Sequence, residues 1–202
     1  MKALLIIDLQ HDFLPGGALA VPEGDALIPL VNQLQPKFDL VVATQDWHPA
    51  HHQSFASEHA GKQPFDLVQL QGVDQVLWPD HCLQGTRGAA FPESLNTNRV
   101  EAIFRKGTET IIDSYSAFYD NGHLKSTALA DYLKAKAVKE VYVAGLAADF
   151  CVYFTAKDAL KEGFETYVIE DATRAISLEG FEKAKADLLS KGGKVVQSND
   201  LI

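Results

Sequence analysis

The sequence predicts an α/β fold, a doubly wound, three-layer arrangement around one mainly parallel sheet of six strands. Short apolar runs alternate along the 202 residues with segments of helical periodicity, which is typical of strand–helix–strand units with right-handed crossovers. The runs are apolar at successive positions, so both faces of each strand are expected to be buried, as in a parallel sheet. The length favours a single domain over residues 1–202.

Six apolar runs predict the strands. They consist mainly of aliphatic and β-branched residues, and the last run is the weakest. In chain order they cover residues 3–7, 40–43, 102–104, 141–144, 166–169 and 194–196.

Four segments between these runs predict helices, since their apolar residues recur at helical spacing or their ends carry capping residues. They are residues 26–34, which end before Pro36; a helix that Ser126 caps and that carries Leu129, Tyr132 and Leu133; residues 148–161, closed by Gly163; and residues 178–190, closed by Gly192-Gly193.

The stretch from about residue 47 to residue 100 interrupts the alternation of predicted strands and helices. It is rich in His, Gln, Gly and Pro and has no sustained periodicity. Long irregular segments in compact domains are usually functional or disordered. Because histidines lie close to both of its tryptophans, we expect a metal-binding insertion here.

The net charge, the length of the apolar runs and the cysteine content limit the classes of partner and the compartment to be expected. The formal net charge of −9 argues against nucleic acid or an anionic membrane as a partner. No apolar run approaches membrane-spanning length, and the N-terminus does not resemble a signal peptide. Two isolated cysteines, Cys82 and Cys151, do not form a disulfide scaffold. The expected compartment is the cytoplasm, with both thiols reduced.

Reactive residues follow four of the predicted strands. Asp8 follows the first, Asp46 and His48 the second, Lys106 the third, and Cys151 begins the helix after the fourth. The carboxyl ends of parallel strands share one edge, where ligands bind. These side chains are therefore expected to converge. A helix N-terminus and a nearby ammonium would also lower the pKa of the Cys151 thiol.

Each of these residues has a simpler interpretation when taken alone. Asp8 could cap a helix, Lys106 could be a solvated surface lysine, and Cys151 could be a buried structural thiol. Arg105 is the better candidate for the solvated position beside Lys106, because neighbouring strand residues face opposite sides. The three together support a nucleophilic site better than any one of them does.

A metal site is suggested by Asp46-Trp47-His48-Pro49 and Trp78-Pro79-Asp80-His81-Cys82. Asp and His two positions apart can offer oxygen and nitrogen to one divalent ion, with a third ligand from a distant loop. His81 is preferred over Cys82, since a thiolate would give a tighter, closed site. A polar loop is an equally good interpretation of the histidines, and the tryptophans either pack in the core or line a ligand pocket.

These motifs resemble the isochorismatase-like cysteine hydrolases and, within them, the nicotinamidases (pyrazinamidases). The pair of metal-site motifs is the discriminating part of the resemblance, because isochorismatases and carbamoyl hydrolases of this fold generally lack it. The matching segments are Asp8-Leu9-Gln10-His11-Asp12-Phe13, Asp46-Trp47-His48-Pro49, Trp78-Pro79-Asp80-His81-Cys82, Phe104-Arg105-Lys106-Gly107, Asp113-Ser114-Tyr115-Ser116-Ala117-Phe118 and Gly145-Leu146-Ala147-Ala148-Asp149-Phe150-Cys151-Val152.

The resemblance implies specific roles. It implies a catalytic triad, a metal site, an oxyanion hole from backbone N–H groups, a ring pocket, and a non-proline cis peptide between Leu146 and Ala147. The residues that match are Asp8, Lys106 and Cys151 for the triad; Asp46, His48 and His81 for the metal, with His52 as a further candidate ligand; Ala147 and Cys151 for the oxyanion hole; and Phe13, Trp78, Tyr115 and Ala148 for the substrate.

The implied activity is hydrolysis of nicotinamide to nicotinate and ammonia through a cysteine thioester, with the metal on the pyridine nitrogen. Pyrazinamide is a second expected substrate, and NAD salvage the expected context. Zinc is the first choice of ion, with iron and manganese as alternatives. The family varies in oligomeric state, which leaves a homo-oligomer open.

Three alternatives compete with this hypothesis. One is another small-amide or carbamoyl hydrolase of the same fold. A second is a catalytically silent binding module, which the complete set of Asp8, Lys106 and Cys151 disfavours. A third is a dinucleotide oxidoreductase, but no G-x-G-x-x-G follows the first strand, and Gly16-Gly17 is only a loop doublet.

Overall fold

A computed structural model describes residues 1–201 and contains the predicted six-stranded sheet. All neighbouring strands in it are parallel, in the order β5-β2-β1-β6-β7-β8. The bounds are β1 (Lys2–Ile7), β2 (Leu40–Asp46), β5 (Val100–Lys106), β6 (Glu140–Leu146), β7 (Glu165–Arg174) and β8 (Lys194–Val196).

The strand order reverses between β1 and β6. The chain first builds outward from β1 through β2 to β5, then returns to the other side of β1 and continues through β6 and β7 to β8. In open parallel sheets a crevice forms at such a reversal, beyond the carboxyl ends of the two strands. Asp8 follows β1 and Cys151 follows β6, so the topology brings both residues to this crevice.

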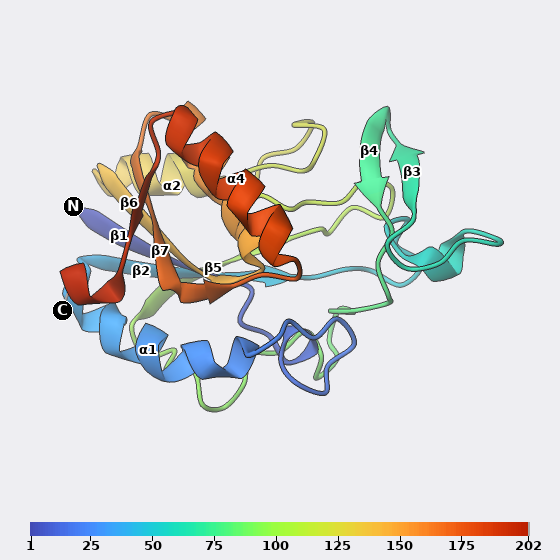
Figure 1. Cartoon of the computed structure of the whole chain (residues 1–202), viewed down its shortest axis with the longest axis horizontal. Helices are drawn as coiled ribbons and strands as arrows, with labels where there is room; N and C mark the ends of the chain where they lie inside the picture. The colour runs from blue at the N-terminus through green and yellow to red at the C-terminus, as the bar shows by residue number, and fades with distance from the viewer. Residues whose placement is uncertain (202) are drawn as a thin grey trace.

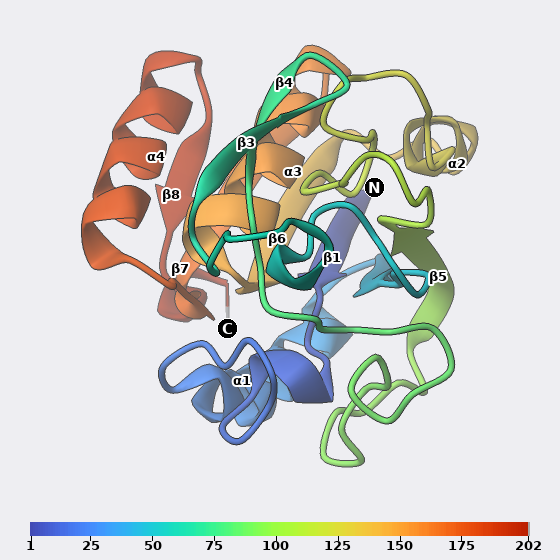
Figure 2. The same cartoon turned by 90° about the vertical axis from the view of Figure 1, so that its right-hand side faces the viewer.

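Helices cover both faces of the sheet, which confirms the three-layer prediction. Helix α1 (Leu27–Leu34) lies on one face, and α2 (Leu129–Ala135), α3 (Tyr153–Lys161) and α4 (Leu178–Ser190) lie on the other (Figures 1 and 2). Alternate residues of β1 separate the two layers: Leu4 and Ile6 pack with the α1 core, whereas Leu5 and Ile7 pack with the core of α2 and α3. Both faces of the strand are thus buried, as the unbroken apolar run predicts.

The helix boundaries agree with the sequence prediction except at two places. The predicted cap Ser126 is wrong: α2 begins after Ala128, and the Ser126 hydroxyl accepts the Ala128 N–H in the preceding turn. The segment before α3 is a π-helical turn, Ala148–Val152, that contains Cys151. Single π turns are rare and are often found at functional sites.

The segment between β2 and β5 contains a hairpin that the sequence analysis missed. Strands β3 (Leu67–Leu70) and β4 (Val73–Val76) pair antiparallel. They are joined at Gln71 and Gly72, both with positive φ, as tight hairpin turns require. The hairpin stands at the end of the molecule opposite the N-terminus (Figure 1). Buried Gln75 anchors it, since its amide donates to Asp113 Oδ2 at 3.1 Å and Tyr115 Oη at 2.8 Å.

The longest helix within residues 1–201 is α4, with 13 residues. None of the helices described is long and apolar enough to cross a membrane.

Gly145 tests how closely β6 and β1 pack at the site edge. Gly145→Ala should lower the free energy of unfolding by at least about 3 kcal/mol, because a steric clash adds to backbone strain. A Cβ there would lie 2.1 Å from Ile7 O, at a φ of +114°. Gly72→Ala is the control: its φ is +81° with nothing within 4 Å of the added carbon, so about 1 kcal/mol is expected. Equal losses in equilibrium denaturant unfolding would contradict this account.

Candidate active site

The ammonium of Lys106 is the centre of a buried polar cluster. Its Nζ lies 2.8 Å from Asp8 Oδ2, 2.5 Å from Asp46 Oδ1 and 3.3 Å from Cys151 Sγ. A fourth contact, at 3.0 Å, is to the carbonyl oxygen of Ser114. The structure therefore brings together the three residues Asp8, Lys106 and Cys151 that the sequence analysis selected. Arg105 is exposed, as expected, and its guanidinium lies over the Trp47 ring.

Strand register explains how these side chains meet. Asp46 and Lys106 are paired residues of β2 and β5, so they end at the same level of the sheet. Asp8 leaves β1 with a φ of 48°, and Thr44 holds it there. The Thr44 hydroxyl donates to Asp8 Oδ1 at 2.6 Å and accepts the Asp8 N–H at 3.2 Å. Thr44 was passed over in the sequence, although its place two residues before Asp46 puts it on the same side of β2.

Burial and charge set the protonation of the cluster. Burial works against the charged form of Lys106, but the carboxylates of Asp46 and Asp8 outweigh it and raise its pKa well above the usual range. Burial raises the pKa of Asp8, against the opposing effect of Lys106. Burial likewise raises the pKa of the Cys151 thiol far above normal. The expectation of a lowered thiol pKa is therefore wrong for this state, because desolvation exceeds the stabilising effect of Lys106.

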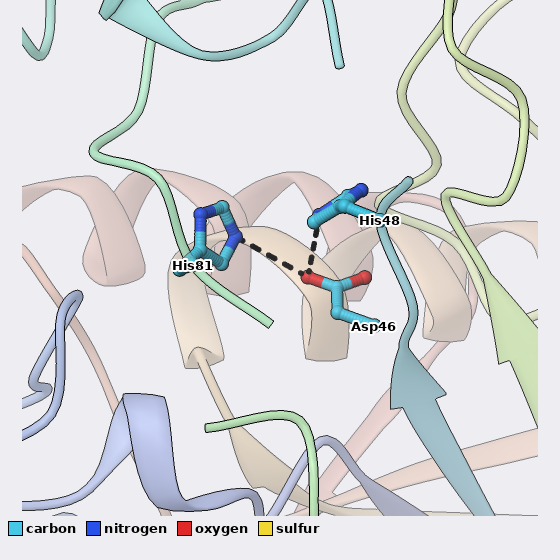
Figure 3. A group of neighbouring side chains, drawn as sticks. All are labelled: Asp46, His48 and His81. Carbon is cyan, nitrogen blue, oxygen red and sulfur yellow. Dashed lines mark ion pairs between the residues drawn. The ribbon is translucent and has the colours of Figure 1, made fainter. Parts of the chain in front are cut away.

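A second group of side chains shares Asp46 with this cluster. Asp46 Oδ2 lies 3.5 Å from His48 Nε2 and 3.6 Å from His81 Nε2 (Figure 3). All three residues are buried, and their ligand atoms lie within 4.8 Å of one another. Donors about 2.1 Å from one ion in tetrahedral geometry are about 3.4 Å apart, so the spacing fits a single divalent metal.

Hydrogen bonds on the far side of each imidazole support the same conclusion. His48 Nδ1 lies 2.9 Å from Gly107 O, and His81 Nδ1 lies 2.7 Å from Pro79 O. Donation from Nδ1 to a carbonyl leaves the Nε2 lone pair free, which is the usual arrangement behind a metal-bound histidine. The buried Nε2 of His48 has no hydrogen-bond partner, and a metal ion would satisfy it.

His52 lies beside this group but its nitrogens are engaged elsewhere. Nδ1 accepts the Ser54 N–H at 3.2 Å and lies 2.7 Å from Ser54 Oγ. Nε2 then carries the hydrogen and lies 3.3 Å from Ile112 O. His52 also falls into a separate group with His48 and Asp113. Cys82, the alternative third ligand, belongs to none of the ligand groups found within residues 1–201.

An aromatic pocket opens onto both clusters. The empty space within it, counted out to the surrounding solvent, is about 320 Å³. Three of the predicted pocket residues, Phe13, Trp78 and Tyr115, line it, together with Asp46, His81, Ala147 and Cys151.

The residues that line the pocket differ from the predicted set at two positions, Phe150 and Ala148. Phe150, which the sequence analysis did not select, lines the pocket and packs edge-to-face on Trp78 and Tyr115. Ala148 does not line it: it is fully buried and lines a separate pocket together with Phe181 and Leu188 of α4. Of the four residues predicted to contact substrate, Ala148 is thus the one that does not line this pocket. The peptide bond between Leu146 and Ala147 is cis, as expected.

Comparison with known proteins agrees with this geometry. The isochorismatase domain model matches residues 2–200. The nicotinamidase of Acinetobacter baylyi is 48% identical over 201 residues, which cover 99% of this chain and 94% of that protein.

Solved structures show the same likeness. A nicotinamidase/pyrazinamidase of Acinetobacter baumanii superposes with a TM-score of 0.97 at 50% identity, covering 100% of this chain and 98% of that one. PnC1 from L. infantum, in complex with nicotinate, gives 0.88 at 39% identity, covering 100% and 94%. The pyrazinamidase of Pyrococcus horikoshii, in complex with zinc, gives 0.80 at 42% identity, covering 97% and 98%.

The hydrogen bonds of the two neighbouring histidines predict different effects on metal binding. His48→Ala should weaken zinc binding by more than about 100-fold, because it removes a ligand rather than a supporting group. His52→Ala should weaken it by less than about tenfold, since both of its ring nitrogens contact protein groups. Calorimetric titration of chelator-treated protein measures both affinities. Equal losses in the two variants would make His52 a ligand.

Proposed function

This chain belongs to the isochorismatase domain family, and we propose that within it the chain is a nicotinamidase, hydrolysing nicotinamide to nicotinate and ammonia. The observation that carries the proposal is the position of Asp46, which joins a cysteine–lysine–aspartate cluster to a metal-type site beside one aromatic pocket. The similarity to nicotinamidases over nearly the whole chain supports it.

The pocket suits a flat heteroaromatic amide. Phe13, Trp78 and Phe150 offer apolar ring surfaces against which an aromatic ring packs. Cys151, Asp46 and His81 line the same pocket. A bound divalent ion, for which we favour zinc, would supply a Lewis-acidic partner for the pyridine nitrogen. A ring so oriented presents its carboxamide to the thiol, which lowers the entropic part of the barrier.

The acylation step uses Asp8 as the base. The raised pKa of Cys151 leaves the proton on sulfur at rest, so Asp8 takes that proton as Sγ attacks the carboxamide carbon. Lys106 keeps its own proton and stabilises the negative charge that moves between Asp8 and the sulfur. The backbone N–H groups of Ala147 and Cys151 receive the oxyanion, at about 2.7–4 kcal/mol per donor.

The intermediate then loses ammonia and takes up water. Asp8 returns the proton to the amide nitrogen as the C–N bond breaks, which leaves a thioester on Cys151. Asp8 next accepts a proton from water while the water oxygen attacks the thioester carbon. The C–S bond breaks, the sulfur regains a proton from Asp8, and nicotinate leaves. Pyrazinamide has a ring nitrogen in the same position relative to its carboxamide, so we expect it to be a second substrate. Nicotinate release places the reaction in NAD salvage.

Cys151→Ala should abolish nicotinamide hydrolysis, lowering kcat by at least about 1,000-fold, because no other group can form the thioester. Cys82→Ala is the matched control. Cys82 is also a fully buried cysteine, but it does not line the pocket described above, so its variant should retain kcat within about threefold. Ammonia release and the mass of the acyl-enzyme measure the outcome. Turnover in Cys151→Ala, or acylation on Cys82, would disprove the mechanism.

Metal removal should affect amides with and without a ring nitrogen differently. Treatment with a chelator should raise KM for nicotinamide by at least about tenfold, since an orienting contact is lost. Benzamide lacks the ring nitrogen, so its kcat/KM should change by less than about twofold. Steady-state ammonia assays on both substrates provide the test. An equal loss for the two amides would contradict the pyridine-anchoring role.

A further inference from the structure

The backbone of Asp46 lies beyond the point where β1 can support it. The β1–β2 pairing ends at Ile6 and Ala43, because the chain turns out of the sheet at Asp8. Asp46 lies three residues further along β2 and is paired with Lys106 of β5 on its other side. On the β1 side, its peptide groups would need another hydrogen-bond partner, since buried backbone groups are rarely left unpaired.

The side-chain amide of Gln10 is the hydrogen-bond partner of these Asp46 peptide groups. Its Oε1 accepts the Asp46 N–H at 2.8 Å, and its Nε2 donates to the Asp46 carbonyl at 2.8 Å. The second Nε2 hydrogen reaches Ala89 O at 2.9 Å. The single amide thus makes the two bonds that two successive peptide groups of a neighbouring parallel strand would make. Gln10 is completely buried, so no water competes for these bonds.

Asp46 needs this support because its two carboxylate oxygens serve different partners. Oδ1 contacts the Lys106 ammonium, and Oδ2 faces the imidazoles of His48 and His81. A rotation of the Asp46 backbone would move both oxygens at once. Displacements of this kind at a catalytic or metal site are costly even when they are small.

We propose that Gln10 is a positioning residue that fixes the Asp46 backbone and thereby aligns its carboxylate with both Lys106 and the metal site. The inference rests on the metal site of the proposed function. It adds a task for the segment after β1, which already supplies Asp8 to the triad and Phe13 to the pocket wall.

The matched control is Gln45. Its side chain donates to the same carbonyl oxygen, Ala89 O, at 3.0 Å, and it is only 6% exposed. Among the described residues, however, its side chain makes no hydrogen bond to Asp46. Gln10→Met and Gln45→Met therefore both replace a buried amide bonded to Ala89, but only the first releases Asp46.

The first measurement is amide hydrogen exchange in metal-free protein. Gln10→Met should speed exchange of the Asp46 amide by at least about tenfold relative to Gln45→Met, because the hydrogen bond that protects this buried amide is lost and the strand end opens. Thermal unfolding of both variants controls for a general loss of stability. Exchange that is equally fast in the two variants would overturn the proposal.

The second measurement is zinc affinity. Gln10→Met should weaken it by about 10–100-fold, as removal of groups that orient metal ligands does, with Gln45→Met within about twofold of the parent. Equal affinities would overturn the alignment role. If a Met variant does not fold, Gln10→Asn and Gln45→Asn give the same comparison, since Asn is one methylene too short to span the gap. If the parent protein binds no zinc, the metal part of the proposed function fails, and amide exchange alone decides the role of Gln10.

Discussion

The buried ammonium of Lys106 is the interaction on which the site depends. A charge removed from water is tolerated only where opposite charges and hydrogen-bond acceptors surround it. Asp8, Asp46, the Ser114 carbonyl and the Cys151 thiol fill these places. The two carboxylates come from different strand ends, so the cluster forms only when β1, β2 and β5 are correctly paired. Removing one partner would leave an uncompensated charge in the core, which is strongly destabilising.

Asp46 connects this cluster to the metal-type site and makes the two a single unit. One oxygen completes the shell of Lys106, and the other faces His48 and His81. Burial works against the charged form of Asp46, but the Lys106 ammonium beside it holds the pKa of this carboxyl well below its usual range. The carboxylate therefore stays ionised and available to a cation. In the proposed mechanism, chemistry at the Cys151 sulfur and orientation of the substrate ring therefore share one residue, and both sites open onto one pocket.

The segment between β2 and β5 supplies the remaining side chains of the metal site and of the pocket. It supplies His48 and His81 as metal-type ligands and Trp78 as a pocket wall. Its hairpin is fixed through Gln75, whose amide bonds Asp113 and Tyr115 on the segment after β5. Irregular backbone can hold such a precise arrangement because buried side-chain amides and imidazoles satisfy its polar groups.

Apolar runs predicted the six strands, because a strand buried on both faces, as β1 is, leaves an unbroken apolar run in the sequence. The edge strand β5 differs from the expectation of two buried faces, since its residues alternate between exposed and half-buried. Strand ends then placed Asp8, Asp46, Lys106 and Cys151 at one edge. Only the tertiary structure decided the rest: the raised pKa of Cys151, the inward burial of Ala148, and the β3–β4 hairpin. It also showed the support that Thr44 and Gln10 give to Asp8 and Asp46. These depend on desolvation and on contacts between residues about 36 positions apart, which no local pattern records.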